Sequence, residues 1–389
     1  MQHALQVELL KELMRQLDEG VNADAGGLRK NPTSAYTCPE IAEREQHTFF
    51  ANHAQIIGCS GELPEPGSFV TVSDFGVEIL ATRDEQGVFH AFLNACRHRG
   101  TMLETARRGQ KKRFSCPFHA WTYTSDGALA NIPMETHFGS VDKTCHGLIE
   151  LPAIENRGFL WVHPDPKGSI NPDELFAGLS DDLDSWNFGS MILADETTYD
   201  MRLNWKLATD TFGETYHFKR LHRDTLAQVF HGDVLAYHTF GRNHRMILCT
   251  RQIDEYRNLP ESQWRINGGG FPVYYLFPNV VLNVTPAGMT MVRAYPVPGD
   301  PGRSISRLSY YFDKDKLMAD PDMARGRSET FAKVVESEDY ATAVTTQRAA
   351  ESGLLDYVIF GRNEPPLHHY HNTFREALGM EPLPLLQKV

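Results

Sequence analysis

Two short motifs place cysteine and histidine side chains at spacings that can hold a metal centre. NACRHRG carries Cys96 and His98 as Cys-x-His, and SCPFHAWTY carries Cys116 and His119 as Cys-x-x-His, with 17 residues between the two pairs. Each pair follows a segment expected to form a strand, so a loop can turn both side chains toward one point. Two thiolates and two imidazoles can bind an iron–sulfur cluster or a zinc ion.

The order of the ligands favours one of these centres. In a Rieske [2Fe–2S] cluster the cysteines hold one iron and the histidines hold the other. Zinc sites usually pair like ligands, as two cysteines followed by two histidines, whereas here cysteine and histidine alternate within each motif. Gly100 and Pro117 fit tight loops whose backbone N–H groups can approach the sulfur atoms. The spacing therefore predicts a Rieske cluster, with structural zinc as the alternative.

A second group of possible ligands lies in NWKLATDTFGETYHFKRLH, where His217 and His222 are spaced as H-x₄-H. Residues five apart on a regular helix point about 140° apart, so both rings can face one ion only where the helix breaks or widens. Two histidines and a distant carboxylate form the facial triad of non-haem Fe(II) oxygenases, which leaves positions open for dioxygen and substrate. An isolated H-x₄-H is more often a pair of packed or surface histidines.

Together, CRHRG, CPFHAWTY and the NWK to H-x₄-H segment resemble the Rieske non-haem iron oxygenases. These proteins are the terminal oxygenase components of bacterial ring-hydroxylating and N-demethylating systems. The resemblance implies an α+β protein with an N-terminal all-β Rieske [2Fe–2S] domain. A helix-grip (START-like) catalytic domain with an antiparallel sheet and a mononuclear Fe(II) would follow it.

The resemblance also assigns residues to the iron site. It implies that His217 and His222 are ligands and that the third ligand is an acid on a late helix, where Asp339 in VESEDYATAVTTQ is the match. Glu338 is the alternative, since neighbouring helical residues point about 100° apart. Glu214 stands where the family most often has aspartate, and it lies three residues before His217. From there it can accept a hydrogen bond from that ring and fix its orientation.

Two acidic residues bear on the reaction. Glu214 is a feature of the quaternary-ammonium branch of the family, which includes carnitine and glycine-betaine oxygenases. Asp210 stands where many relatives have asparagine near the iron. Its two interpretations, a role near the iron and a solvated carboxylate in a first helical turn, are both open.

Aromatic strands could form the walls of a substrate cavity above the iron. Such residues are more often plain core, and aromatic walls suit a flat aromatic substrate as well as a quaternary ammonium. Our leading expectation is an aromatic substrate, with a betaine or carnitine as the alternative. The aromatic-strand candidates are Phe271, Tyr274, Tyr275, Phe277 and Asn279.

The family implies that electrons enter at the cluster, cross to the Fe(II) and support hydroxylation of an organic substrate by dioxygen. NADH would supply them through a separate reductase, and a ferredoxin is possible, because the chain has neither G-x-G-x-x-G nor plant-type ferredoxin spacing. The family also implies transfer between neighbours in a homotrimer, with Glu214 as the bridge, and a β subunit is possible. A non-catalytic Rieske electron carrier is the alternative of another class.

Two further clusters have ordinary interpretations beside functional ones. Between Arg97 and Arg113 lie seven basic residues against the single acid Glu104, which could attract an acidic electron donor or form a solvated hairpin tip. His368, His369 and His371 in PPLHHYHNTF are expected to be incidental histidines at the start of a surface helix.

Composition narrows the function classes. The 389 residues carry 38 Lys+Arg against 50 Asp+Glu, a net charge of −12 that argues against nucleic-acid binding. No apolar run approaches a membrane span, and the start of the chain reads as an amphipathic helix and not as a signal peptide. Six scattered cysteines do not make a disulfide scaffold. We therefore expect a cytoplasmic protein.

The elements that must position these residues fall into three segments. Residues 1–45 are expected to form a helical segment that packs on the catalytic domain. Residues 46–163, with short alternating strands and frequent turns, form the expected Rieske domain. Residues 164–389 form the expected catalytic domain, in which an antiparallel sheet packs against long helices.

Overall fold

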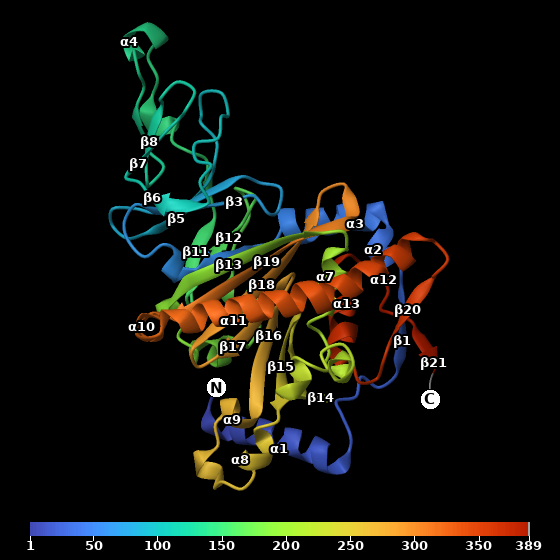
Figure 1. The fold of residues 1–389 in the computed structure, drawn as a ribbon. Helices are drawn as coiled ribbons and strands as arrows, with labels where there is room; N and C mark the ends of the chain where they lie inside the picture. Colours follow the sequence, from blue (N-terminus) through green and yellow to red (C-terminus); the bar gives the residue numbers. More distant parts are fainter. Residues whose placement is uncertain (388–389) are drawn as a thin grey trace. The chain divides into compact units, whose positions relative to one another are not determined.

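The computed structural model describes residues 1–387, which form two compact units (Figure 1). The smaller unit comprises His47–Pro172 and Asn187–Ile192. The larger unit comprises Met1–Gln46, Asp173–Trp186 and the chain from Leu193 onward. The α+β class predicted from the sequence is confirmed, because the smaller unit is built mainly of strands and the larger one combines a sheet with helices.

The smaller unit consists of three antiparallel sheets with the strand orders β10-β5-β4-β3-β6, β11-β12-β2 and β7-β8-β9. Short helical turns connect them, of which α4 (Glu135–Phe138) is one. The strands are β2 (Gln55–Cys59), β3 (Ser68–Val72), β4 (Ile79–Arg83), β5 (Phe89–Leu93), β6 (Arg108–Gln110), β7 (Arg113–Ser115), β8 (Thr122–Thr124), β9 (Leu129–Asn131), β10 (Glu150–Leu151), β11 (Ala153–Asn156) and β12 (Phe159–Val162).

One hydrophobic core of this unit surrounds the cysteines of the first motif pair. Cys96 and Cys116 are buried there beside Phe114 of β7, Tyr123 of β8 and Leu80 of β4. Alternating apolar residues in these short strands turn one face inward, which produces this core. The cysteines therefore lie at the inner ends of the two loops that follow β5 and β7.

The larger unit is built on a seven-stranded sheet with the order β13-β19-β18-β17-β16-β15-β14. The pairs from β14 to β19 are antiparallel, and each strand from β15 to β19 pairs with the strand before it in the chain. The strands are β13 (Met191–Met201), β14 (Phe230–Phe240), β15 (Asn243–Thr250), β16 (Gly270–Leu276), β17 (Val280–Thr285), β18 (Gly288–Val297) and β19 (Asp300–Asp313).

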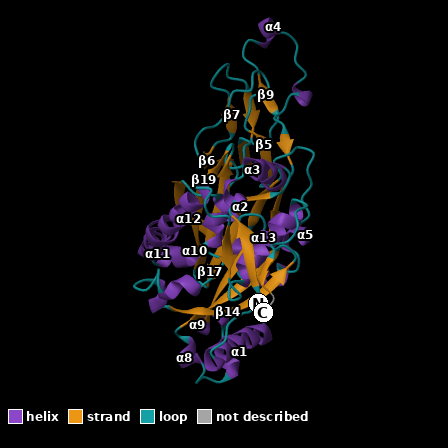
Figure 2. Ribbon diagram, turned by 90° about the vertical axis from the view of Figure 1, so that its right-hand side faces the viewer, coloured by secondary structure: helices purple, strands orange, loops and turns teal. Residues whose placement is uncertain are grey.

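Three consecutive helical segments run along this sheet without a break. They are α11 (Pro321–Val334), a π-helical turn η8 (Val335–Tyr340) and α12 (Ala341–Glu351). Figure 1 shows α11 crossing the strands, and Figure 2 shows α11 and α12 on the same flank of the sheet. This arrangement agrees with the helix-grip fold that the family resemblance implies.

The remaining helices of the larger unit support the sheet. The N-terminal amphipathic helix is present as α1 (His3–Glu19), and its Leu10 and Leu13 pack against β14 and β15. A small sheet joins β20, β1 and β21. The other segments include α2 (Ser34–Thr37), α3 (Pro39–Glu45), α5 (Pro172–Phe176), α6 (Ser180–Asp184), α7 (Trp205–Asp210), α8 (Ile253–Tyr256), α9 (Ile266–Gly269), α10 (Lys314–Ala319), α13 (Pro365–Ala377), β1 (Leu28–Pro32), β20 (Tyr357–Phe360) and β21 (Leu385–Gln387).

The described helices include no candidate for a membrane span. Within residues 1–387, none has both the length and the apolar character needed to cross a bilayer.

Candidate active site and cluster site

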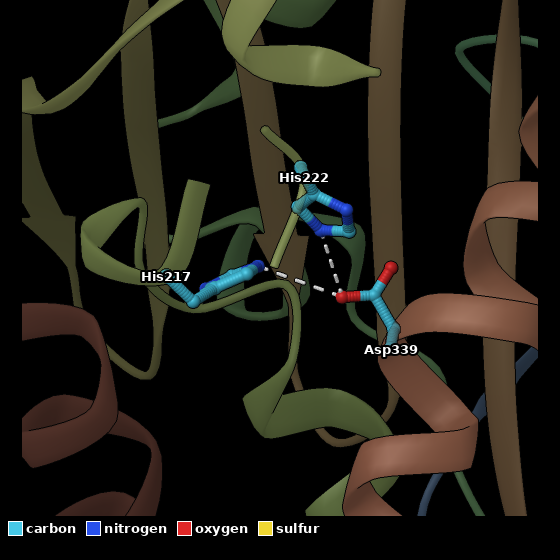
Figure 3. A group of neighbouring side chains, drawn as sticks. All are labelled: His217, His222 and Asp339. Carbon is cyan, nitrogen blue, oxygen red and sulfur yellow. Dashed lines mark hydrogen bonds and ion pairs between the residues drawn. The ribbon is translucent and has the colours of Figure 1, made fainter. Parts of the chain in front are cut away.

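His217, His222 and Asp339 come together in the larger unit (Figure 3). The carboxylate oxygen Oδ1 of Asp339 lies 3.1 Å from Nε2 of His222 and 3.5 Å from Nε2 of His217. One ligand atom from each residue lies within 4.8 Å of the others. Two imidazoles and one carboxylate directed at one point are a donor set for a divalent transition metal with open coordination positions.

The backbone around the histidines has the interruption that their spacing predicts. Helix α7 ends at Asp210, a 3₁₀ turn follows over Tyr216–Lys219, and His222 lies in the next turn. Because the chain does not continue as a regular helix, the five-residue spacing no longer separates the two rings. The expected distortion is confirmed.

Asp339 is presented by the π-helical turn between α11 and α12. A π turn inserts one extra residue into a helix and changes the direction of the side chains that follow it. In this turn Asp339 is 6% exposed and faces both histidines, whereas Glu338 points to the far side of His222. The structure therefore separates the two candidate acids that the sequence left open.

Each histidine also contacts a glutamate through its other ring nitrogen. Nδ1 of His217 hydrogen-bonds Glu214, and Nδ1 of His222 lies 2.5 Å from Oε2 of Glu338. Thr225 donates a further hydrogen bond to Glu338 at 3.0 Å. A proton on each Nδ1 leaves each Nε2 free to bind a metal. Sequence reasoning anticipated the contact of Glu214, but it considered Glu338 only as an alternative ligand and missed its contact with His222.

The electrostatics of this group suit a cation. Burial lowers the pKa of His217, but the close carboxylates of Asp339 and Glu214 outweigh burial and raise this pKa to about 9. Burial raises the pKa of Asp339, and its contacts with the two histidines bring it below its ordinary value. Nε2 of His217 is buried and has no hydrogen-bond partner among the described residues. An orphaned imidazole nitrogen beside an ionised carboxylate fits a ferrous ion.

A cavity of about 240 Å³ adjoins the three residues, and phenylalanines dominate its walls. Of the aromatic-strand candidates, Phe271 lines this cavity. Tyr274 and Tyr275 are instead fully buried, and the Asn279 side chain donates to the backbone of Ala294. The phenylalanines of the wall are Phe212, Phe218, Phe230, Phe271 and Phe331.

Asp210 lies apart from the ligand group in a separate buried network. Its carboxylate accepts a hydrogen bond of 2.8 Å from the Tyr36 hydroxyl and lies 3.0 Å from Nε2 of His371. Asp210 is not one of the described residues that line the cavity. His371 and His368 are 2% and 5% exposed, so the expectation of incidental surface histidines is wrong. Helix α13 is packed into the unit, and His371 serves as a partner for a buried acid.

The two cysteine–histidine loops have the same backbone closure. In the first, the N–H of Cys96 donates to the carbonyl of Thr101, and that of Gly100 donates back to Cys96. In the second, Cys116 donates to Trp121, and Ala120 donates back to Cys116. Gly100 and Ala120 occupy equivalent left-handed positions, with φ of 74° and 55°. The loops thus present their ligands as a matched pair.

The side chains of these loops fit a two-iron cluster. The cysteines are buried, whereas His98 is half-buried and His119 is exposed, with ring centroids 4.7 Å apart. Burial raises the pKa of the Cys96 thiol, although the Tyr123 hydroxyl, 3.4 Å from its sulfur, opposes this. Nδ1 of His98 is buried without a partner among the described residues. Thiolates on the inside and an unpaired imidazole nitrogen nearer the tip match one iron held by cysteines and one by histidines.

Comparison with known families agrees with both sites. Residues 53–146 match the family described as "Rieske [2Fe-2S] domain". Residues 188–380 match the family described as "Ring hydroxylating alpha subunit (catalytic domain)". The matched segments contain the two loops and the three-residue group.

Similar proteins include monooxygenases that are named for their substrates. The chain is 25% identical over 341 residues to the carnitine monooxygenase oxygenase subunit of Acinetobacter baumannii, covering 82% of this chain and 85% of that protein. It is 26% identical over 355 residues to the chloroplastic choline monooxygenase of Beta vulgaris, covering 89% and 76%.

Solved structures give the same picture of the fold. The chain superposes with a TM-score of 0.76 on a quaternary ammonium Rieske monooxygenase in complex with L-carnitine, at 23% identity, covering 92% of this chain and 97% of that one. A second structure, reported with insights into carnitine oxidation and inter-subunit electron transfer, matches with the same TM-score at 22% identity and the same coverage.

Proposed function

We propose, on the premise that this chain belongs to the Rieske non-haem iron oxygenases, that it is the oxygenase component of a quaternary ammonium monooxygenase. Membership makes the protein an oxidoreductase with a Rieske [2Fe–2S] cluster and a mononuclear iron. The relatives reported above are named for carnitine and choline, which does not support our leading sequence-based expectation of an aromatic substrate. These names favour the alternative that Glu214 suggested.

The observation that carries the proposal is a phenylalanine-walled cavity beside an anionic metal site. Asp339, Glu214 and Glu338 together bring three carboxylates against the two charges of a ferrous ion, which leaves a formal negative charge. Aromatic faces attract quaternary ammonium groups, and the attraction is stronger where water is excluded. A neutral aromatic substrate would use the same walls but would gain nothing from the negative charge.

The proposed reaction inserts one oxygen atom into a C–H bond on a carbon attached to the ammonium nitrogen. Dioxygen, two electrons and two protons yield the hydroxylated substrate and one water molecule. The C–N bond of the hydroxylated carbon then breaks, giving a tertiary amine, a carbonyl compound and a proton. The mononuclear iron, when bound, supplies the activation of dioxygen.

The chain's own residues prepare this reaction by holding and orienting groups. His217, His222 and Asp339 would hold the iron, while Glu214 and Glu338 fix the planes of the two rings through their Nδ1 atoms. The phenylalanine walls orient the methylated nitrogen and exclude water. Cys96, Cys116, His98 and His119 would hold the cluster that receives electrons.

Electrons reach the oxygenase from a reductase that uses NADH, with or without a ferredoxin. We propose that the functional oxygenase is a homotrimer in which the cluster of one chain serves the iron of its neighbour. Glu214, adjacent to His217, would lie on that path. The proposal rests on the family resemblance, and a β subunit remains an alternative assembly.

The test is substrate-dependent oxygen uptake by the purified, iron-reconstituted protein with a surrogate reductase and NADH. We expect a quaternary ammonium from a panel of betaines, carnitine and choline to raise uptake and to yield a carbonyl product in equal amount. Turnover of aromatic acids alone would contradict the proposed substrate class. Iron analysis separates the other class of function, because an oxygenase holds three irons per chain and a Rieske electron carrier holds two.

A further inference from the structure

The cavity beside His217, His222 and Asp339 continues into a second chamber of about 330 Å³. We call the first cavity the inner chamber and the second the outer chamber. Five residues line both spaces, so the chambers adjoin along a shared wall. The inner chamber faces β14 to β17, whereas the outer chamber extends over β18 and β19 beneath α11. The shared residues are Leu226, Phe271, Asn283, Phe331 and Val334.

The outer chamber differs from the inner one in charge. Arg327 of α11 lines it, and none of the described aspartates or glutamates does. Within the described part of the chain, the Arg327 side chain makes no hydrogen bond or ion pair, so its guanidinium is available to a ligand. A guanidinium can bind a carboxylate through two parallel hydrogen bonds.

Asn283 marks the junction of the two chambers. It is 9% exposed, and its amide nitrogen Nδ2 has no hydrogen-bond partner among the described residues. It pairs with Thr290 of β18 across the sheet, and Thr290 lines the outer chamber. A buried amide donor without a partner is uncommon, and one that lines a cavity indicates a ligand with an acceptor group.

The positions of these residues set the length of that ligand. Arg327 precedes Asp339 by twelve residues along the nearly continuous helix, which corresponds to about 18 Å at 1.5 Å per residue. The outer chamber reaches β19, three strands from β16, or about 14 Å across the sheet. Part of this separation is taken up by the arginine side chain itself and by the gap between the ammonium group and the iron ligands. A betaine with only one carbon between nitrogen and carboxylate is the least able to bridge what remains, and a chain of several carbons reaches further toward Arg327.

We propose that Arg327 and Asn283 form a carboxylate subsite, and that the substrate is a betaine with a chain of several carbons between its ammonium and carboxylate groups. This inference rests on the proposed function, which places the ammonium group in the inner chamber. Arg327 is then a specificity-determining residue, because it selects zwitterions over purely cationic ammonium compounds. The negative inner chamber and the positive outer chamber fix the direction in which the substrate binds.

The test compares 4-(trimethylammonio)butanoate with its carboxamide, which keeps the ammonium charge but lacks the carboxylate, and with glycine betaine and choline. Dissociation constants are measured calorimetrically on the holoenzyme, and KM and kcat are measured by carbonyl product formation. We expect the wild-type protein to bind the butanoate at least tenfold more tightly than the other three compounds. Arg327→Met should remove this preference while leaving the affinity for the amide unchanged.

Arg325→Met provides the matched control, because Arg325 and Arg327 are both exposed on the same helix, but only Arg327 lines the chamber. We expect it to behave as wild type. Asn283→Leu should also weaken butanoate binding more than choline binding. Equal binding of the butanoate and its amide, or an unchanged preference in Arg327→Met, would overturn the subsite while turnover of ammonium compounds still supported the proposed function. Failure of all four compounds to bind or react would overturn both.

Discussion

At the scale of single residues, each proposed iron-binding histidine lies between two carboxylates. His217 contacts Glu214 with Nδ1 and approaches Asp339 with Nε2, and His222 contacts Glu338 and Asp339 in the same manner. Asp339 is thus shared, while each glutamate serves one ring. The arrangement fixes which nitrogen of each ring faces the metal position, because the glutamates hold the protons on Nδ1.

Glu338 provides the sharpest test of this division of roles. We expect Glu338→Gln to weaken binding of the mononuclear iron about 10- to 100-fold, because His222 loses the carboxylate that orients it. Asp339→Asn should reduce the iron content from three to two per chain, since it removes a ligand, and it should leave the spectrum of the cluster intact.

Iron stoichiometry during titration with a chelator measures both variants. Glu336→Gln is the control, because Glu336 is exposed on the same π turn and contacts neither histidine. If Glu338→Gln removed the iron completely while Asp339→Asn retained it, the two assignments would have to be exchanged.

The residue scale also shows where sequence reasoning ends. The five-residue spacing of His217 and His222 predicted a broken helix if both rings face one ion, while the shared metal itself followed from the family resemblance. The family resemblance favoured Asp339 over Glu338, but helix geometry could not decide between them, because adjacent residues on a helix differ by a rotation that the π turn changes. No local feature of the sequence predicts the π-helical turn at Val335–Tyr340.

At the scale of elements, the cluster site depends on two loops with one geometry. Gly100 and Ala120 occupy the same left-handed position, yet only the first is glycine. Left-handed backbone costs a residue with a Cβ atom about 1 kcal/mol. A Cβ added at Gly100 would meet no atom within 4 Å, so the only cost expected from an alanine there is that of the left-handed backbone.

We therefore expect Gly100→Ala to lower the free energy of unfolding of the cluster domain by about 1 kcal/mol without loss of the cluster. Ala120→Gly should raise the free energy of unfolding, but by less than about 1 kcal/mol, since glycine also gains entropy in the unfolded chain. Urea unfolding followed by the visible absorption of the cluster measures both. If Gly100→Ala lowered the free energy of unfolding by several kcal/mol, the added methyl group would have to clash with another atom, which would contradict the open space around Gly100.

Elements that lie far apart in sequence were the hardest to anticipate. The alternating strands and the N-terminal amphipathic helix followed from periodicity. The burial of α13 did not, because its histidines look polar until His371 meets Asp210, 161 residues away. Polar residues become core residues when a distant partner satisfies them, and one sequence does not reveal such pairs.

At the scale of the whole molecule, the basic run stands out from a net charge of −12. The structure shows that part of it is engaged within the smaller unit, where Lys111 pairs with Glu104 and Arg108 with Glu62. Lys112 and Arg113 are exposed and make no ion pair with described residues. These two, and not the paired ones, are the better candidates for attracting an acidic electron donor.

We expect Lys112→Glu with Arg113→Glu to slow reduction of the cluster about tenfold at low ionic strength, because the charge reversal repels an acidic donor. Raising the salt concentration should shrink the difference. Stopped-flow reduction by the cognate reductase or ferredoxin measures the rate. The control carries Arg325→Glu and Lys333→Glu on α11, outside the smaller unit. Equal rates for the two double variants at every salt concentration would leave the basic run as a solvated hairpin.

The proposed trimer makes a quantitative prediction that no single chain could satisfy. A Cys116→Ser chain lacks the cluster and an Asp339→Ala chain lacks the mononuclear iron, so each should be inactive alone. When equal amounts of the two variants assemble at random into trimers, half of the chains keep the iron site. Half of those chains have, on the side from which electrons arrive, a neighbour that keeps the cluster. If electrons cross in one direction around the ring, activity should return to about a quarter of wild type. Transfer within each chain predicts none, so an inactive mixture in which mass spectrometry detects mixed trimers would exclude the inter-subunit path.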